Sequence, residues 1–376
     1  MEGGGIRSYY LAKFLMENNH QVRVVTAHNN LKGHHVVDGI SITYLKIPYH
    51  NAFPFAKRIR SFIEFVLFAI FISGRTHKAD LNYVITTPLS TGLIALYLKF
   101  KKRIPYVFEV GDLWPEVPVQ LGFIRRSFSK NIFYSFEKYC YSKANIIVAL
   151  SPSIQDYIDK KIDRSVKTIV IENMSNCETF RPISNFPKAF DKKKPFKICY
   201  IGTIGIANEI ENLVDFSKAC EKANLPIETT IMGNGGRKKE IELLCLKASS
   251  IVMKDHGNYS EVVRLLNESH AIYVSFQDVN ILHTGCPNKF FDGLSAGKLI
   301  ILNFSGWLRE IVEKNNCGFY QNPKDLNSSL KKVTEFLNIE KLRVASSNSR
   351  QLAEFRFNKD LLCLKWYRSV IQGFVT

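Results

Sequence analysis

The sequence predicts an α/β protein built from two doubly wound domains that face a cleft. Short apolar strands alternate with longer helical patterns along the whole chain, the second half repeats the scheme of the first, and a segment with little periodicity separates them. Alternating strands and helices imply parallel sheets with right-handed crossovers. In such sheets ligands bind beyond the carboxyl ends of the strands, so two facing domains would place a site in the cleft between them.

The individual elements follow from the apolar runs and their periods. In the first half we expect strands at "QVRVVT", "ISITYL", "LNYVIT", "PYVFEV", "NIIVAL" and "KTIVI", and helices that start near Ile6, Phe55, Leu89, Ser127 and Pro152. In the second half we expect strands at "FKICYIG", "IETTIMG", "SIVMK", "AIYVSF", "KLIILN" and "CGFYQ", and helices near Glu209, Lys238, Ser260, Lys289 and Leu308, with three mostly helical segments from Asp325 onward.

The stretch "ENMSNCETFRPISNFPKAFDKKKPF" is rich in Asn, Pro and Lys and is predicted to link the domains, with the hinge near residues 181–194. The predicted domains are therefore residues 1–183 and 184–376. We expect the last helix, about residues 359–374, to pack back on the N-terminal domain.

The composition bounds the class of protein. A chain of 376 residues, 46% hydrophobic, is long enough for large cores, and 51 Lys+Arg against 34 Asp+Glu give a net charge of +17. This charge favours phosphorylated ligands, an anionic membrane face or nucleic acid. The eight cysteines lie far apart with no C-x-x-C pair, which indicates neither a zinc site nor a disulfide framework and suits a reducing cytoplasm. No apolar run approaches the roughly 20 residues of a membrane span, and the N-terminus lacks the pattern of a signal peptide.

The chain opens with Gly3, Gly4 and Gly5 directly before a helical pattern. Such glycines are typical of a strand-to-helix turn where the backbone approaches a ligand closely. We therefore expect a strand ahead of them that the recorded start omits. The alternative is a disordered, glycine-rich tail.

The stretch "HTGCPNKFFDGLSAGKLIILN" is the most informative one. Asn288 can cap a helix that Gly297 ends, and Asp292 lies one turn beyond Lys289 on the same face. A carboxylate suits the paired hydroxyls of a sugar, whereas a lysine at a helix N-terminus suits phosphate. The alternative is an ordinary surface ion pair. In "YIGTIG" and "IMGNGG", glycines follow strands where a backbone can approach phosphate, although each signal alone is also typical of a turn.

In the first half, "FEVGDLWPE" places Asp112 and Glu116 directly after a strand. Acidic side chains there are candidates for general bases or for binders of sugar hydroxyls. Alternatively, Asp112 caps the next helix and Glu116 is solvated.

Over nearly its whole length the chain resembles glycosyltransferase family 4, which has the GT-B fold of two Rossmann-like domains, and within it the bacterial surface-polysaccharide transferases (O-antigen or capsule type) with a D-L-W-P-E motif. The matching stretches are "EGGGIRSYYLAKFLMENNHQVRVVTA", "FEVGDLWPEVPVQLG", "EKYCYSKANIIVALSPSIQDYI", "VIENMSNCETFRP" and "GCPNKFFDGLSAGKLIILN". Relatives begin with a strand and a proline-containing turn before the glycines.

The resemblance implies a retaining transferase that moves a hexose or an N-acetylamino sugar from a nucleotide-diphosphate donor, without a metal ion or other cofactor. Asp112 and Glu116 would be the catalytic residues, Asp112 near the reacting sugar and acceptor, and the departing phosphate would help take the acceptor proton. Asp292 would hold the ribose diol, since it falls on the second acid of the family's E-x7-E motif. The residues expected near the diphosphate are Gly3, Gly4, Gly5, Gly202, Gly205 and Lys289.

The chain departs from the family pattern in three places. Thr284 stands where the first glutamate of E-x7-E is expected, and "ENMS" stands for the family's P-N-G at the linker. "YIGTIG" lacks the downstream arginine and lysine that many relatives use on the diphosphate. Lys289, Arg237 and Lys238 are the candidates to replace that pair.

The leading function is extension of a lipid-linked (polyprenyl diphosphate) saccharide for surface polysaccharide. A nucleotide-sugar 2-epimerase of the same fold and a basic nucleic-acid-binding protein are the alternatives. The second is disfavoured because the sequence shows no zinc finger, no RNP signature and no long basic tract.

The segment "AKRIRSFIEFVLFAIFISGRTHK" is basic at both ends and apolar between them. It is too short to span a bilayer, but an interfacial helix fits, with Lys57, Arg58 and Arg60 on anionic lipid. The alternative is a buried helix of the N-terminal domain. We thus expect a cytoplasmic protein associated peripherally with the inner face of the cytoplasmic membrane.

Overall fold

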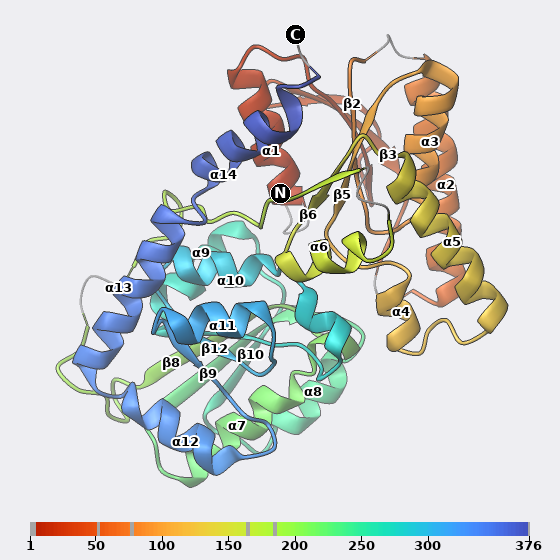
Figure 1. Cartoon of the computed structure of the whole chain (residues 1–376). Coiled ribbons are helices and arrows are strands. Elements are labelled where there is room, and N and C mark those ends of the chain that lie inside the picture. Colours follow the sequence, from red (N-terminus) through yellow and green to blue (C-terminus); the bar gives the residue numbers. More distant parts are fainter. Residues whose placement is uncertain (1–4, 51–52, 76–78, 163–165, 183–185, 375–376) are drawn as a thin grey trace. The chain divides into compact units, whose positions relative to one another are not determined.

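The computed structural model describes residues 5–50, 53–75, 79–162, 166–182 and 186–374. Contacts divide them into two compact units. The N-terminal unit consists of the described residues up to Glu172, of Thr284–Cys286, and of the described residues from Leu362 onward, and the C-terminal unit consists of Asn173–His283 and Pro287–Leu361. Each unit is built from helices and mainly parallel strands, as predicted (Figure 1).

In the N-terminal unit the described strands fall into two sheets, one with the order β4-β5-β6-β7 and one with the order β1-β3-β2. The strands are β1 (Arg23–His28), β2 (Gly33–Val37), β3 (Ile40–Lys46), β4 (Asn82–Ile85), β5 (Tyr106–Val110), β6 (Ile146–Ala149) and β7 (Lys167–Val170). The helices are α1 (Ile6–Glu17), α2 (Phe55–Arg75), α3 (Thr91–Lys102), α4 (Glu116–Gln120), α5 (Ser127–Lys143) and α6 (Pro152–Asp159). Every strand predicted for the first half is present.

Strand β2 was not predicted, and it runs antiparallel to β3. Asp38 and Gly39 join the two strands with φ angles of 50° and 84°. Positive φ at both central residues is the geometry of a two-residue hairpin, for which Asp-Gly is a favoured sequence. The "DG" in the sequence was therefore an available signal for this hairpin.

A buried polar network fixes α1 to the four-stranded sheet. Arg7 is 6% exposed, and its Nε donates to Glu109 Oε1 at 3.0 Å while its Nη1 donates to the Glu172 carbonyl. The Tyr83 hydroxyl also donates to Glu109, and Trp366 Nε1 donates to the Tyr83 hydroxyl at 3.1 Å. Through Trp366 the end of the chain joins the N-terminal unit.

The C-terminal unit has one six-stranded sheet with the order β10-β9-β8-β11-β12-β13, in which all pairs are parallel. The strands are β8 (Phe196–Thr203), β9 (Ile227–Asn234), β10 (Ile251–Lys254), β11 (Ala271–Val274), β12 (Leu299–Leu302) and β13 (Gly318–Tyr320). The order reverses between β8 and β11, so the connections that follow these two strands diverge. A ligand crevice is expected at the carboxyl ends of the strands at this point.

Helices lie on both faces of this sheet (Figure 1). The helices of this unit are α7 (Glu211–Lys222), α8 (Lys238–Cys245), α9 (Tyr259–Glu268), α10 (Asn288–Ser295), α11 (Trp307–Lys314), α12 (Leu326–Glu335) and α13 (Ile339–Phe355). Helix α14 (Lys359–Trp366) begins in the C-terminal unit and ends in the N-terminal unit. The start of the predicted linker packs within the C-terminal unit. Asn173, Ser175 and Asn176 are buried, and the backbone of Ser175 forms hydrogen bonds with the backbone of Phe357 and Lys359. The hinge near residues 181–194 stays a prediction, and residues 183–185 lie outside the described ones.

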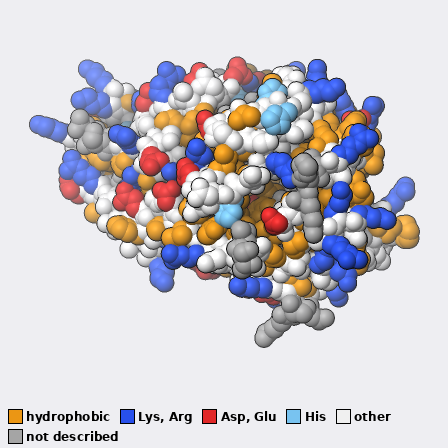
Figure 2. Space-filling view, turned by 90° about the horizontal axis from the view of Figure 1, so that it is seen from above, with side chains coloured by type: hydrophobic (Ala, Val, Ile, Leu, Met, Phe, Trp, Pro, Cys, Tyr) orange, Lys and Arg blue, Asp and Glu red, His pale blue; other side chains and the backbone are white. Residues whose placement is uncertain are grey.

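All eight cysteines are free. Among the described residues, no three His, Cys, Asp or Glu side chains are grouped so that they could hold a metal ion, and no helix has the length and apolar character needed to cross a membrane. Figure 2 shows Lys and Arg side chains spread over the face that it presents, with apolar side chains exposed between them.

Candidate active site

The end of β8 lies at the switch point of the C-terminal sheet, where a ligand crevice is expected. Gly202 has a φ of +144°, and a Cβ built on it would lie 2.8 Å from Nζ of Lys289. Only glycine therefore leaves room for the lysine at this place. Gly205, three residues on, has extended backbone and precedes a short 3-10 helix, Ile206–Asn208.

Helix α10 brings Lys289 to this strand end. It follows β11 and starts at the carboxyl side of the sheet, as the helix of a βαβ unit does. The prediction that Asn288 caps α10 is wrong: Asn288 is the first helical residue, and the N-cap is Pro287, with no side-chain cap bond. The end was predicted correctly, since Gly297 follows the C-cap Ala296 with a φ of +58°.

Lys289 and Asp292 lie one turn apart and form no ion pair within the described residues, so the alternative of a surface ion pair is wrong. The Lys289 ammonium lies instead 4.0 Å from the centroid of the Tyr200 ring. Loss of solvation lowers the pKa of Lys289 to about 7 and raises the pKa of Asp292 to about 7. Two groups of opposite charge are thus held in the first turns of α10 without a charged partner among the described residues.

Gly233 of "IMGNGG" has a packing role. A Cβ on Gly233 would lie 1.9 Å from the Gly202 carbonyl oxygen, and the two residues are register partners in β8 and β9. Gly233 therefore allows the backbones of the two strand ends to approach each other, which is the turn-and-packing alternative for this motif.

Arg237 and Lys238 are already engaged with acids of the same unit. Arg237 pairs with Glu211 at 2.7 Å and with Glu240 at 2.6 Å. Lys238 pairs with Asp255 and Glu242. Of the three candidate replacements for the family's basic pair, Lys289 is the one whose charge is not matched by a described acid.

Thr284 ends the short 3-10 helix Asn280–Thr284 that precedes α10.

In the N-terminal unit, Asp112 follows β5 and Thr87 follows the neighbouring strand β4. The Thr87 hydroxyl donates to Asp112 Oδ2 at 3.5 Å. Thr87 has a φ of +105°, which is rare for a β-branched residue and is a feature that clusters at functional sites. Asp112 does not cap α4, because the N-cap is Pro115 and no side chain caps the helix. Asp112 is exposed, yet the surrounding protein displaces enough water to raise its pKa.

Glu116 is not a solvated side chain. Its carboxylate accepts hydrogen bonds from the Tyr134 hydroxyl at 2.6 Å, from Gln120 Nε2 at 2.8 Å and from the Tyr157 hydroxyl at 3.3 Å. Burial alone would raise the pKa of Glu116, but these donors and the nearby Lys161 lower it overall. No described contact joins Glu116 to Asp112, and its catalytic role stays a prediction.

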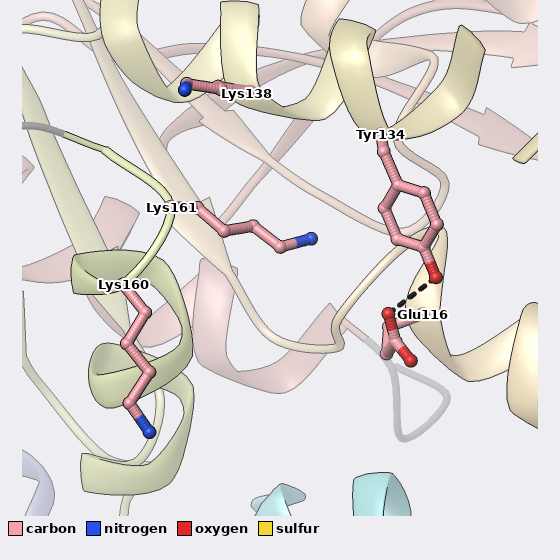
Figure 3. Close-up of a pocket in the computed structure, with 5 residues that line it drawn as sticks. All are labelled: Glu116, Tyr134, Lys138, Lys160 and Lys161. Atoms are coloured by element: carbon pink, nitrogen blue, oxygen red, sulfur yellow. Dashed lines mark hydrogen bonds between the residues drawn. The ribbon is translucent and has the colours of Figure 1, made fainter. Parts of the chain in front are cut away.

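Glu116 borders an open pocket of about 460 Å³, which we call the lysine pocket (Figure 3). Its lining residues are Glu116, Tyr134, Lys138, Lys160 and Lys161. Our sequence analysis missed all but Glu116. Tyr134 and Lys138 are one helical turn apart, which was a usable signal for a shared face, but nothing in the sequence indicated that α6 would bring Lys160 and Lys161 to it.

Two further sets of predicted residues belong to the N-terminal unit. Gly3 and Gly4, with any strand before them, lie outside the described residues. Gly5 is exposed, has a φ of −102° and would accept a Cβ without contact, so its backbone does not itself require glycine.

Near the start of α2, Lys57 and Arg60 are exposed and Arg58 is half-buried. Lys57 is stacked on Phe53 with 3.7 Å to the ring centroid, and Arg58 lies over Phe123 at 5.7 Å. Arg60 pairs with Glu64 at 2.7 Å. Farther along α2, apolar side chains at a spacing of four residues are exposed, namely Ile59, Ile63, Leu67 and Phe71.

The opposite side of α2 is buried. Val66 and Ala69 pack with residues of β3 and α3 in one apolar cluster. Helix α2 is therefore a packed helix of the unit with an exposed apolar stripe on its other side, and its contact with a membrane stays a prediction.

Comparison with known proteins gives the class of the chain. A family model described as "Glycosyl transferase 4-like domain" matches residues 2–173, and one described as "Glycosyl transferases group 1" matches residues 183–351. None of the curated proteins with which the sequence was compared matches it.

Among solved structures, sucrose-phosphate synthase from Thermosynechococcus elongatus is similar over 97% of this chain and 92% of that chain, with 15% identity and a TM-score of 0.76. Anabaena HepE in complex with UDP-glucose is similar over 98% and 96%, with 14% identity and a TM-score of 0.68. WaaG, a glycosyltransferase involved in lipopolysaccharide biosynthesis, is similar over 97% and 96%, with 12% identity and a TM-score of 0.66.

Two α/β units with mainly parallel sheets define a protein of the GT-B fold, which the solved structures confirm. Because glycosyltransferase models match both halves, the chain is a GT-B glycosyltransferase of the family 4 type.

Proposed function

We propose that the protein is a retaining glycosyltransferase that moves a sugar from a nucleotide-diphosphate donor to a lipid-linked (polyprenyl diphosphate) saccharide in the synthesis of surface polysaccharide. The observation that carries the proposal is the arrangement of Lys289 and Asp292, which are of opposite charge, one turn apart, and without a charged partner among the described residues. Such an arrangement is costly unless a ligand supplies the missing partners.

A nucleotide-diphosphate sugar supplies both partners. Its diphosphate suits the Lys289 ammonium and the N-terminus of α10, which carries positive partial charge. Its ribose diol suits the Asp292 carboxylate, which can accept a hydrogen bond from each hydroxyl. Gly202 and Gly205 have no side chains, so the diphosphate can come close to their backbone. We assign the same phosphates to a set of glycines at the start of the chain, namely Gly3, Gly4 and Gly5. A donor that contains UDP is supported by the UDP-glucose bound to HepE.

In the proposed reaction, the bond between the anomeric carbon and the donor phosphate oxygen breaks, and the acceptor oxygen bonds to the same face of that carbon. The acceptor proton passes to the departing phosphate. Asp112 is assigned to the acceptor and the reacting sugar, where its carboxylate accepts a hydrogen bond from a hydroxyl and disperses developing positive charge. No metal or further cofactor is part of the proposal.

The acceptor is proposed to reach the enzyme along α2, at the inner face of the cytoplasmic membrane. The exposed apolar stripe of α2 suits the boundary between headgroups and acyl chains, and Lys57, Arg58 and Arg60 suit anionic lipid. The Phe62 ring, also on α2, meets the Trp114 ring edge-on at 6.4 Å. Because Trp114 belongs to the same D-L-W-P-E stretch as Asp112, this contact supports a path from α2 to the acceptor side.

A screen of nucleotide sugars for thermal stabilisation tests the donor. A donor at 100 times its dissociation constant adds about 2.7 kcal/mol to the free energy of unfolding. We expect nucleotide sugars of one class to raise the melting temperature of the unchanged protein. The same compounds should raise the melting temperature of the Asp292→Asn variant far less.

The matched control is Asp215→Asn, an exposed carboxylate of the same unit, which should respond as the unchanged protein does. If no nucleotide sugar stabilises the protein, or if Asp292→Asn responds in full, the assignment of the donor site is wrong.

A further inference from the structure

The lysine pocket has a rigid floor. Lys161 Nζ pairs with Glu137 Oε2 at 2.6 Å, and the Glu137 side chain is fully buried. Lys161 also donates to the Tyr157 hydroxyl, which in turn donates to Glu116 at 3.3 Å. Each group of this chain of hydrogen bonds thus has a partner, so the floor is organised without a ligand.

Aromatic rings hold the Lys161 ammonium in place. It lies 4.5 Å from the centroid of the Tyr134 ring and 4.1 Å from that of the Tyr157 ring. In Figure 3, Lys161 reaches across the pocket toward Tyr134 and Glu116. The two rings therefore hold the ammonium at one position in the pocket.

The rim carries positive charge that the protein does not neutralise. Lys138, on α5, and Lys160, just after α6, both border the pocket and are exposed. Neither has an ion pair with a described residue. The acid in the lining, Glu116, already accepts three hydrogen bonds from neutral donors. Lys138 and Lys160 thus border the pocket without an ion pair among the described residues, whereas Lys161 is paired with Glu137.

The ammonium groups without an ion pair favour an anion with several oxygens. Lysines bind phosphate as point charges, and a phosphate group offers enough oxygens to meet ammonium groups from several directions. A volume of about 460 Å³ lies within the range of small-molecule sites. The pocket can therefore take a phosphate group together with part of the molecule that carries it.

We propose that the lysine pocket binds a phosphate ester group of the acceptor, between Lys138, Lys160 and Lys161. This inference rests on the proposed function, because it assigns the pocket to the acceptor of that reaction. Glu116 then acts as a positioning residue, which orients Tyr134 and Tyr157 and through them Lys161. The phosphate ester is carried either by a prenyl lipid or by a sugar.

Binding of small phosphate esters to the purified protein tests the proposal without any transfer reaction. The probes are geranyl diphosphate and glucose 1-phosphate, titrated by calorimetry at constant ionic strength in the Lys289→Ala variant, so that the proposed donor site contributes little. We expect at least one probe to bind and its dissociation constant to rise at least tenfold when Lys138→Ala and Lys160→Ala are added. Binding of geranyl diphosphate alone assigns the pocket to a lipid-borne phosphate, and binding of glucose 1-phosphate alone to a sugar-borne one.

The matched control adds Lys247→Ala and Lys331→Ala to the same background. These lysines are also exposed and without an ion pair in the described part of the chain, so the net charge changes equally. An equal loss of binding in both variants, or no binding of either probe, would overturn the proposal. Either result leaves the donor assignment intact, because that assignment is measured separately with nucleotide sugars and Asp292→Asn.

Discussion

The Lys289 ammonium lies over the Tyr200 ring, 4.0 Å from its centroid, beside the backbone of Gly202. Tyr200 is fully buried in β8, and its hydroxyl donates to the Thr203 carbonyl at 2.6 Å, so the ring has a fixed orientation. A ring attracts a cation without neutralising it. The lysine is thus positioned by the protein while its charge remains available to an anion.

Gly202→Ala should weaken donor binding, and because Gly202 has a φ of +144° the alanine should also destabilise the C-terminal unit. The new Cβ would lie 2.8 Å from Lys289 Nζ, and the flexible lysine end would move away from its place over Tyr200. Loss of a charge-assisted contact costs about 1.5–3 kcal/mol, roughly a tenfold to hundredfold rise in the dissociation constant. Calorimetry with the stabilising nucleotide sugar measures this rise, and Gly236→Ala, where a Cβ meets nothing within 4 Å, is the control.

The affinity for the donor should be highest near pH 7 and fall on both sides. The pKa of Asp292 is raised to about 7, so the carboxylate charge is lost as the pH falls through 7. The pKa of Lys289 is lowered to about 7, so the ammonium charge is lost as the pH rises through 7. Each limb should approach a tenfold loss of affinity per pH unit, because one proton is exchanged. Calorimetry between pH 5.5 and 8.5 measures the profile.

The single variants separate the two limbs. Lys289→Met should lose the decline on the alkaline side, and Asp292→Asn should lose the decline on the acidic side. A profile that keeps both limbs in both variants would assign the titration to other groups.

The arrangement of the β8 end and the α10 start was largely predictable because its signals are local, whereas donor binding there stays a prediction. Strand, glycine and helix start follow one another within a few residues at "YIGTIG" and "GCPNKFFDG", and the order of the strands brings these two stretches to the same sheet edge. Sequence could not decide whether Lys289 and Asp292 pair, because that depends on where the lysine points. The ring of Tyr200 and the missing side chain at Gly202 decide it.

The lysine pocket was not predictable in the same way. Its residues come from α4, α5 and the turn after α6, and which faces of three helices meet depends on their packing. Glu116 illustrates the limit: the sequence could not show that α4 turns the Glu116 carboxylate toward Tyr134. The hairpin at Asp38 and Gly39 is different, because its signal was in the sequence and was overlooked.

Asp112→Asn should lower turnover more than donor affinity. The amide keeps the shape of the side chain but removes the charge that we assign to the transition state and the acceptor. We expect kcat to fall by about 100-fold or more, which corresponds to about 2.7 kcal/mol, with the donor dissociation constant changed less than twofold. Steady-state kinetics together with donor titration measures both values. A change in donor affinity as large as that in kcat would place Asp112 at the donor instead.

The Arg7–Glu109 pair should be a large contributor to the stability of the N-terminal unit. Both side chains are buried, at 7% and 1% exposure, and removal of one partner leaves the other charge buried without compensation. Breaking such a pair costs about 3–5 kcal/mol. We therefore expect Arg7→Met to lower the urea midpoint strongly, whereas Arg60→Met, which breaks the exposed pair with Glu64, should leave the midpoint unchanged. Equal midpoints for the Arg7 variant and the unchanged protein would mean that the pair contributes no net stability.

Helix α2 should be the surface through which the protein binds anionic membranes. Its outward residues Ile63, Leu67 and Phe71 are 55%, 62% and 52% exposed, and each basic residue near an anionic surface contributes about 1 kcal/mol. Changing Lys57, Arg58 and Arg60 together to glutamate should therefore lower binding to vesicles with anionic lipid by on the order of 100-fold or more.

The apolar stripe of α2 gives a second, independent prediction for the same vesicles. Ile63→Gln with Leu67→Gln should weaken co-sedimentation while the melting temperature stays unchanged, because both side chains point away from the core. The matched control is Leu243→Gln with Leu246→Gln, on the C-terminal unit, where two apolar side chains are exposed at 68% and 77%. If only the charge variant loses binding, α2 attaches to headgroups without inserting. If the α2 variants and the control all bind as the unchanged protein does, α2 is not the membrane surface.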